Sequence, residues 1–400
     1  MVMLMRIIMH IDVNSAFLSW EAVDMLNKGY SIDIRNIPSV IGGDQLSRHG
    51  VVLAKSIPSK KYGILTGESI YNALKKCKQL KIYPPHFDIY ERESNNLYNY
   101  LLNYSPKVER ASIDECYIDY TGMERLFGDP IELANKMREE IKNKYGWTVN
   151  IGIGNNKLCA KMASDFSKPN KVHTLFMDEV KDKMWNLPVS DLYMIGRETV
   201  KKLSCFDINT IGDLANYDLF KLEKTFKNQA YMMKDYANGV DDSEVIDIPV
   251  ENKGISISKT YPKDLNSKDE VKVVLIDLVN ELCVKLRSMD VYSQVVSLVL
   301  KNSSFEHYSC QKKMINCTNI TNDIYKECLL LLDKLYRNEN IRLVGVSLTS
   351  FSKQMDIQLS LFDKFDKKKE EKLEKVIDSI NSKYGNTVIN YAVCVKKSKN

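Results

Sequence analysis

The feature that most constrains the fold of this chain is the spacing of its apolar residues, which changes twice along the sequence. Up to about residue 176, short apolar runs typical of strands alternate with amphipathic stretches typical of helices. Residues 181–242 predict helices alone, and strand-like runs return from residue 254. A chain of 400 residues is too long for one hydrophobic core. We therefore expect several domains of α+β type.

The first region opens with residues 5–13, MRIIMHIDV, which predict a fully buried strand. A helix is expected next, with Asn14 or Ser15 as its N-cap and Gly29 at its end. The runs IPSVIGG and GVVLAKS, separated by polar residues, predict a hairpin. Further on, KVERASIDECYIDYTG predicts a strand, a turn and a second strand.

Residues 254–353 predict the order strand, helix, strand, strand, helix, strand, which forms a compact unit. Beyond it the sequence holds a short apolar motif, a helix rich in Lys and Glu, and a last strand, TVINYAVCVK. We expect the charged run DKKKEEKLEKV to be only a solvated helix face.

Composition is that of a globular protein, with 44% hydrophobic and 27% charged residues. No apolar run approaches the ~20 residues that span a bilayer. The apolar N-terminus lacks a signal-peptide cleavage site, so a cytoplasmic protein without a membrane partner is expected. The nine cysteines show no zinc spacing and predict free thiols. A net charge of +5 permits a polyanionic partner without requiring one.

Two adjacent carboxylates, Asp114 and Glu115, interrupt the apolar run SIDECYID. A buried carboxylate is costly unless it is paired, protonated or bound to a metal. Asp12 ends the first strand, and neighbouring strands would bring the three acids together. Carboxylate oxygens suit Mg²⁺, and two such ions support phosphoryl transfer. The spacing fits equally well two exposed turn residues and a helix-capping Asp12.

Three stretches carry a resemblance to a known family: HIDVNSAF, SIDECYID and GNNKLCAKMASDFSKPNKV. Their order and distances resemble those of the Y-family, translesion DNA polymerases, in particular the polymerase IV-like bacterial branch, over about residues 5–350. The resemblance implies a right-hand polymerase of α+β class. Its parts would be a palm (1–12 and 86–176), fingers (13–85), a helical thumb (177–242), a βαββαβ little finger (252–350) and a C-terminal extension (351–400).

The resemblance implies a template-directed DNA polymerase that uses two Mg²⁺ ions to join dNTPs to the 3′-hydroxyl of primed template DNA. Asp12 and Asp114 would bridge both ions, helped by the carbonyl of Val13. Glu115 would serve the ion that activates the primer hydroxyl. Asn14 stands where many relatives have a second Asp, a position that is not a required ligand.

Phe17 lies five residues after Asp12 and matches the steric gate, the ring that collides with a 2′-hydroxyl and excludes ribonucleotides. The alternative is an ordinary core phenylalanine on an amphipathic helix. The backbone N–H groups of Ser15 and Ala16, at a helix start, suit phosphate binding.

Lys168, in SKPN, matches a lysine that reaches the incoming triphosphate. In AKSIPSKKYGI, by contrast, relatives carry Tyr and Arg on the triphosphate where this chain has Ile57 and Lys60. Lysine keeps the charge but loses the bidentate geometry of arginine, and isoleucine donates nothing. We expect Lys60, and not Ile57, to contact phosphate.

Two weaker motifs concern DNA and a protein partner. Residues 192–216 resemble a helix–hairpin–helix with Gly196 in its turn, which would aim N–H groups at a DNA phosphate; a plain helical hairpin is the alternative. The run QLSLF matches the peptide that docks bacterial polymerases on the sliding clamp (beta subunit), and a buried strand is the alternative. The clamp-binding residues would be Gln358, Leu359, Leu361 and Phe362.

The sequence thus predicts a monomeric translesion polymerase of low processivity, tethered to the clamp. One competing hypothesis is a non-catalytic, clamp-binding repair accessory that keeps the fold, which the exchanges at Ile57 and Lys60 leave open. Another is a palm-fold nucleotide cyclase, suggested by IGGDQL and disfavoured by the thumb, little finger and clamp motif.

Overall fold

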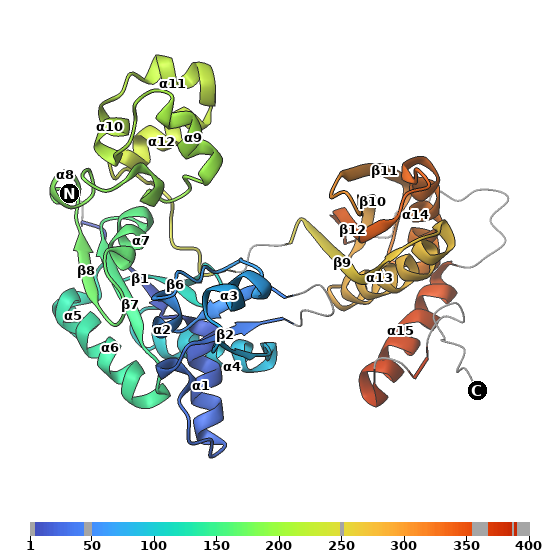
Figure 1. Cartoon of the computed structure of the whole chain (residues 1–400), viewed down its shortest axis with the longest axis horizontal. Coiled ribbons are helices and arrows are strands. Elements are labelled where there is room, and N and C mark those ends of the chain that lie inside the picture. The colour runs from blue at the N-terminus through green and yellow to red at the C-terminus, as the bar shows by residue number, and fades with distance from the viewer. Residues whose placement is uncertain (1–4, 44–49, 249–251, 354–366, 386–387, 390–400) are drawn as a thin grey trace. The chain divides into compact units, whose positions relative to one another are not determined.

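The computed structural model describes residues 5–43, 50–248, 252–353, 367–385 and 388–389 (Figure 1). These residues form two compact units, one before residue 249 and one after residue 251, which are considered separately. None of the helices in these ranges has the length and apolar character needed to cross a membrane.

The first unit is built on a five-stranded sheet in the order β5, β6, β1, β7, β8. The strands are β1 (Ile8–Val13), β5 (Val108–Arg110), β6 (Glu115–Asp119), β7 (Val149–Gly154) and β8 (Val172–Leu175). β1 is central and pairs antiparallel with β6 and β7. The strand, turn and strand expected around SIDECYID are confirmed as β5 and β6, whereas β8 was not predicted.

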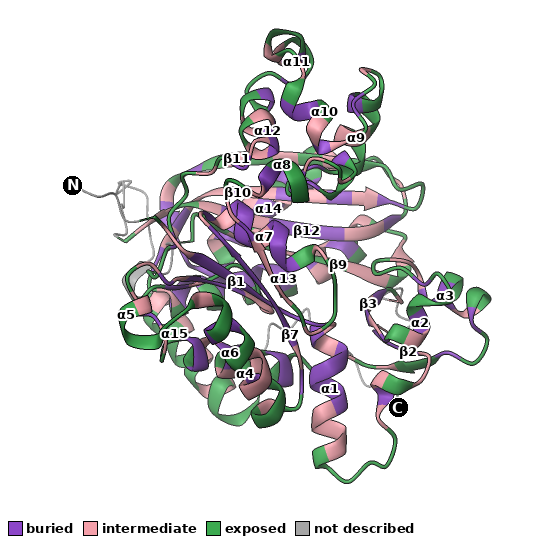
Figure 2. Cartoon of the chain, turned by 90° about the vertical axis from the view of Figure 1, so that its left-hand side faces the viewer, coloured by how far each residue is buried: buried purple, intermediate pink, exposed green. Residues whose placement is uncertain are grey.

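Both faces of β1 are covered, as its unbroken apolar run predicts (Figure 2). Helices α4 (Phe87–Leu101) and α6 (Pro130–Tyr145) pack on one face in a core shared with Met9. On the other face, Ile8 packs against Ala160 of α7 (Lys157–Asp165).

Two glycines of β7 let α7 approach the sheet closely. A Cβ on Gly152 would lie 2.0 Å from the carbonyl oxygen of Ala160, so no other residue fits there. Gly154 is similarly close to Cys159. Because alternate side chains of a strand share a face, His10 and Asp12 lie with Ile8 on the side of α7. The glycines of NIGIG therefore serve helix–sheet packing.

A smaller sheet of three strands lies beside α1 (Ala16–Asn27). The predicted hairpin is confirmed as β2 (Ser39–Gly42) and β3 (Val52–Lys55), while β4 (Lys81–Tyr83), parallel to β2, was not predicted. Ser15 is the N-cap of α1, but it is left-handed (φ 50°) and its side chain accepts no cap hydrogen bond. Further helices of this unit are η1 (Ile34–Asn36), α2 (Ile57–Lys60), α3 (Ile70–Lys76) and α5 (Glu124–Phe127).

Residues after β8 form short helices around a core of their own, as the sequence predicts. They are α8 (Val180–Lys183), η2 (Val189–Asp191), α9 (Arg197–Ser204), α10 (Ile211–Asn216), α11 (Leu219–Phe226) and α12 (Gln229–Ala237). Residues of α7 belong to the same core, which joins this helical part to the five-stranded sheet.

The second unit confirms the predicted order of strands and helices. Its elements are β9 (Gly254–Leu265), α13 (Lys268–Ser288), β10 (Tyr292–Asn302), β11 (His307–Thr318), α14 (Thr321–Leu335) and β12 (Ile341–Ser352). The antiparallel sheet has the order β11, β10, β12, β9. Apolar side chains of α13 and α14 form the core with the sheet.

The prediction that the Lys/Glu-rich helix is only a solvated face is wrong. In α15 (Lys367–Tyr384), Glu374 and Asp378 pair with Arg287 of α13, whose side chain is only 3% exposed. The Arg287 Nε–Asp378 Oδ2 distance is 2.5 Å, and Tyr292 donates to Glu371 at 3.0 Å. These acids are spaced by three and four residues and therefore share one face of α15. The last predicted strand falls mostly on residues outside the described ranges.

Candidate active site

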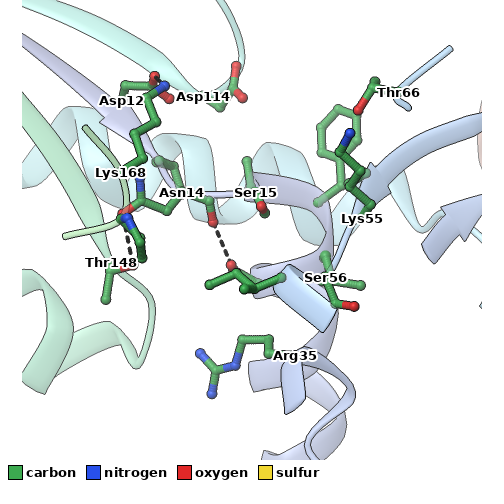
Figure 3. A pocket seen from close by; sticks show the side chains of 18 of the residues that line it. Asp12, Asn14, Ser15, Arg35, Lys55, Ser56, Thr66, Asp114, Thr148 and Lys168 are labelled. Atoms are coloured by element: carbon green, nitrogen blue, oxygen red, sulfur yellow. Dashed lines mark hydrogen bonds and ion pairs between the residues drawn. The ribbon is translucent and has the colours of Figure 1, made fainter. Parts of the chain in front are cut away.

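A cavity of about 730 Å³ lies in the first unit, between the end of β1 and the start of α2 (Figure 3). It gathers the predicted residues of this unit from elements far apart in sequence, with the exception of Gly196. Its lining includes Asp12, Val13, Ser15, Ala16, Phe17, Lys60, Asp114, Glu115 and Lys168.

The three acids meet because of strand register. Asp12, at the end of β1, lies opposite Glu115, the first residue of β6. The N–H of Val13 donates to the carbonyl of Asp114 at 3.1 Å, which joins the turn to the strand end. Ser112 holds this turn through a hydrogen bond of 2.7 Å to the Asp114 carboxylate. Two charges therefore interrupt an apolar run because they sit where the strand begins and line the cavity.

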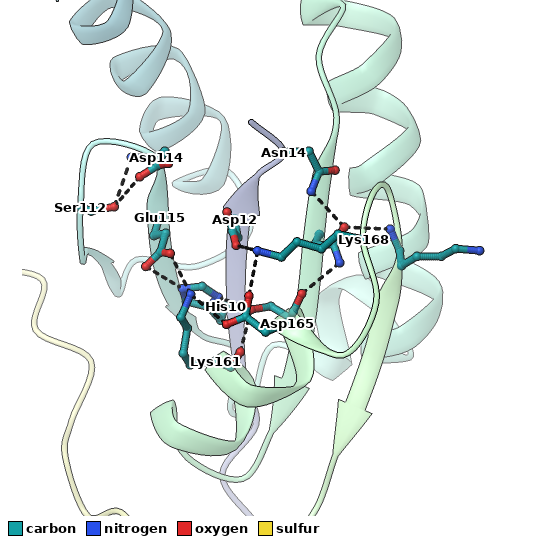
Figure 4. A network of polar contacts seen from close by, with 12 residues as sticks. His10, Asp12, Asn14, Ser112, Asp114, Glu115, Lys161, Asp165 and Lys168 are labelled. Carbon is teal, nitrogen blue, oxygen red and sulfur yellow. Dashed lines mark hydrogen bonds and ion pairs between the residues drawn. The ribbon is translucent and has the colours of Figure 1, made fainter. Parts of the chain in front are cut away.

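Two lysines pair with two of these acids, Asp12 and Glu115 (Figure 4). Lys168 forms an ion pair with Asp12 and a second, of 2.8 Å, with Asp165. Lys161 of α7 lies 2.8 Å from Glu115 and 3.3 Å from Asp165. Burial alone would raise the pKa of Glu115, but hydrogen bonds from His10 and Lys161 lower it to about 2. Glu115 is therefore a carboxylate at neutral pH.

His10 also faces Glu115 and was missed by the sequence analysis. Its Nδ1 lies 2.8 Å from the hydroxyl of Ser164, and its Nε2 lies 3.5 Å from Glu115 Oε2. Burial lowers the pKa of this imidazole, which favours its neutral form. The missed signals were the position of His10 two residues before Asp12, and the four-residue spacing of Lys161 and Asp165 on α7.

The donor types around this end of the cavity fit Mg²⁺, although the side chains are turned toward the lysines. Asp12, Asp114 and Glu115 line the same space, together with Val13. Hard oxygen donors of this kind are those Mg²⁺ prefers. Among the described residues, no group of three or more His, Cys, Asp or Glu side chains has a geometry that could already coordinate a metal ion. Occupation by a metal would need the acids to leave their lysines.

Phe17 lines the cavity and is also packed from behind. Its ring stacks on Tyr90, with 4.3 Å between centroids and 11° between planes. The Tyr90 hydroxyl donates to Glu21 at 2.7 Å, and Glu21 also accepts the N–H of His86. Phe17 thus both lines the cavity and packs against a core residue, so each of its two interpretations, steric gate and core phenylalanine, describes part of its surroundings.

Asn14 stands where many relatives have an Asp, and the sequence alone does not reveal its structural role. Its Nδ2 donates to Asn150 at 3.1 Å, and its Oδ1 accepts the N–H of Asn170 at 2.8 Å. An amide can perform both roles, whereas a carboxylate could accept from Asn170 but could not donate to Asn150. Asn14 thus ties β7 to the loop that carries Lys168.

The other side of the cavity is basic. Lys60 lines it, and so does Ile57, which is half exposed. Lys55 of β3, which was not predicted, also lines the cavity and donates to the carbonyl of Ile64 at 2.6 Å. Burial and the neighbouring Lys60 lower the pKa of Lys55.

Comparison with known proteins identifies the family. The profile of the impB/mucB/samB family matches residues 11–165, and that of its C-terminal domain matches residues 252–361. DNA polymerase IV of Clostridium acetobutylicum is 44% identical over 394 residues, which cover 98% of this chain and 99% of the relative. The chain belongs to the Y family of DNA polymerases. DNA polymerase IV 2 of Bacillus subtilis is 32% identical, with 96% of this chain and 93% of that protein covered.

The solved structure of a Y-family polymerase chimera of Dbh and Dpo4 matches this fold with a TM-score of 0.74. The match has 26% identity and covers 86% of this chain and 98% of the chimera. The expected right-hand α+β fold with palm, fingers, thumb and little finger is confirmed, and the chain is a DNA-directed DNA polymerase of the translesion type. The accessory and cyclase hypotheses are therefore wrong.

Gly196, the predicted DNA-binding residue, does not line the cavity. Gly196 is the N-cap of α9 with φ −86°, and the left-handed residue of its turn is Met194. A Cβ on Gly196 would meet open space, so the fold itself does not require glycine there. The clamp motif at 358–362 falls in the part of the chain that is not described.

Proposed function

We propose that this polymerase extends a primer on template DNA through two Mg²⁺ ions, held by the carboxylates of Asp12, Asp114 and Glu115 and the carbonyl of Val13. The observation that carries the proposal is the register of β1 and β6, which places Asp12 opposite Glu115 on the cavity. The Y family as a whole depends on divalent metal ions. When bound, the ions would neutralise phosphate oxygens and lower the pKa of the primer hydroxyl.

The chain's own residues would bind and orient the nucleotide. Lys168 can exchange Asp12 for a triphosphate oxygen, because it already lies in the cavity on a flexible stem. Lys60 would bind the same group from the opposite side. The first N–H groups of α1, at Ser15 and Ala16, lack intrahelical acceptors and favour an anion.

We assign the steric gate to Phe17. Tyr90 packs against the far side of the ring, so the ring could not move aside to make room for a 2′-hydroxyl of a sugar in the cavity. This selects deoxyribonucleotides by exclusion and needs no hydrogen bond.

We further propose the palm, fingers, thumb, little finger and extension at the boundaries given above, since the sheets and helical clusters follow them. Gly196 would present backbone N–H groups to DNA phosphate. Gln358, Leu359, Leu361 and Phe362 would dock a monomeric polymerase on the sliding clamp and compensate for low processivity. Because its substrates are DNA and dNTPs, we also propose that the polymerase acts in the cytoplasm.

Primer extension with Mg²⁺ and dNTPs tests the proposal, with wild type compared with Glu115→Ala. Glu109→Ala is a matched control, because Glu109 is an acid of the same sheet, pairs with Lys157 of α7 and does not line the cavity. We expect extension to be lost only in Glu115→Ala. Equal extension by both variants would remove Glu115 from the catalytic site, and none by folded wild type would refute the activity.

A further inference from the structure

Lys161 is an unusual neighbour for an acid expected to bind metal. Its side chain is only 12% exposed, and its ammonium lies 2.8 Å from Glu115 inside the cavity. Close packing of α7 on Gly152 fixes the helix that carries it. The backbone of Lys161 is therefore held in a fixed position beside the sheet.

The ammonium of Lys161 lies between two acids that line the cavity. Besides Glu115, it lies 3.3 Å from Asp165, which also pairs with Lys168. Asp12 is buried and Glu115, on the neighbouring strand, is partly buried, so both carboxylates would destabilise the fold without cations beside them. Lys161 and Lys168 supply one positive charge to each. Asp12 and Glu115 therefore each have a cation beside them without a divalent ion, although this end of the cavity holds two further acids, Asp114 and Asp165.

We propose that Lys161 is a positioning residue that occupies the place of the catalytic cation on Glu115 and yields it when a divalent ion binds. The inference rests on the proposed metal site. It assigns Lys161 a role different from that of Lys168, because Lys161 is held on α7 and pairs with Glu115, whereas Lys168 lies in the loop after α7 and pairs with Asp12. Metal affinity is then set partly by the strength of the Lys161–Glu115 pair.

Substitutions at Lys161 should change metal affinity in opposite directions. Lys161→Met removes the competing charge, so Mg²⁺ should bind at least about tenfold more tightly, a lower bound for a unit charge a few ångströms from a divalent ion. Lys161→Arg should bind Mg²⁺ more weakly than wild type, since a guanidinium holds a carboxylate through two hydrogen bonds. Lys157→Met is the matched control, because Lys157 lies one turn away on α7 and pairs with Glu109 outside the cavity.

Two measurements on the full chain without DNA or nucleotide test this. Calorimetric titration with MgCl₂ gives the affinities, and thermal unfolding in EDTA and in MgCl₂ gives the stability. Lys161→Met should melt lower than wild type in EDTA and regain most of the difference in MgCl₂, whereas any loss in Lys157→Met should be the same in both. Equal Mg²⁺ affinity in wild type, Lys161→Met and Lys161→Arg would overturn the inference.

Glu115→Ala separates this inference from the proposed function. If wild type binds Mg²⁺ and Glu115→Ala weakens binding while both Lys161 variants match wild type, only the role of Lys161 is refuted. If Glu115→Ala binds Mg²⁺ as wild type does, the metal site itself is refuted, and the inference with it. Should Lys161→Met fail to fold, Lys161→Arg alone still decides, because weaker binding supports the inference and unchanged binding contradicts it.

Discussion

The ring of Phe17, which lines the cavity, stacks face to face on that of Tyr90, with 4.3 Å between their centroids. The hydroxyl of Tyr90 is fixed in turn by Glu21. Sugar selection in this polymerase is therefore expected to depend on a supported ring.

Phe17→Ala should admit ribonucleotides. Removing the ring opens space for a 2′-hydroxyl, so the preference for dATP over ATP should fall by at least about tenfold, the discrimination that one or two methylene groups can provide. Steady-state kcat/KM for the two nucleotides measures it. Phe127→Ala, which alters an exposed ring outside the cavity, serves as the control. An unchanged ratio in Phe17→Ala would exclude the gate role.

Lys60→Met should raise KM for dNTPs while leaving DNA binding intact. A hydrogen bond to a charged group contributes about 1.5–3 kcal/mol, so a rise of roughly tenfold or more is expected. Lys61→Met, at the adjacent position that does not line the cavity, should have little effect. Equal KM values in the two variants would contradict a phosphate contact at Lys60.

Arg287→Met should destabilise the second unit. The substitution leaves Glu374 and Asp378 without their buried partner, and breaking a buried ion pair typically costs about 3–5 kcal/mol. Urea unfolding of the full chain, followed by hydrogen exchange in α15, would report it. Lys375→Met removes a more exposed charge and should cost no more than about 1 kcal/mol. Similar losses in both variants would show that Arg287 does not anchor α15.

Docking of α15 should weaken in acid. Burial alone would raise the pKa of Glu371, but hydrogen bonds from Lys375, Tyr292 and Asn319 lower it below its ordinary value of 4.5. A lowered pKa stabilises the fold above the unfolded value and loses that effect as the pH falls through the folded one. The stability difference between wild type and Glu371→Gln should therefore shrink as the pH drops below about 4.5. A difference that is constant from pH 7 to pH 4 would contradict this.

Alanine at both Leu361 and Phe362 should abolish stimulation by the sliding clamp and leave basal extension unchanged. Apolar anchors of this kind dominate peptide docking. Leu373→Ala with Val376→Ala is the control, since both are exposed apolar residues of the same C-terminal region. Primer extension with and without clamp measures the effect, and full stimulation of the Leu361/Phe362 variant would remove the motif from the clamp interface.

Much of the fold was predictable because its strongest elements are local patterns. The unbroken apolar run of β1 and the alternating order of the second unit could be recognised without knowing any partner. β4 and β8 were missed because they are short and pair in parallel with strands distant in sequence, whereas the equally short β2, β3 and β5 belong to hairpins that the sequence marks with a turn.

The acids of the site were predictable from motifs, whereas their partners were not. Asp12 and Glu115 occur in recognisable stretches, but their pairing with Lys168 and Lys161 depends on how α7 packs on β7. Arg287 pairs with acids about ninety residues away, and a charged helix gives no local sign that one of its faces is covered. Ion pairs between distant elements are properties of the tertiary fold.

The anchoring of α15 also has a consequence for the segment before it. The chain leaves the second unit after β12 and rejoins the same unit at α15, so residues 354–366 connect two points of one folded body. Closing a chain at both ends removes conformations that a free tail would have. A clamp that binds QLSLF would therefore bind a segment whose two ends both continue into the second unit. The reach of that segment is set by the chain length from two anchors, at most about 3.5 Å per residue.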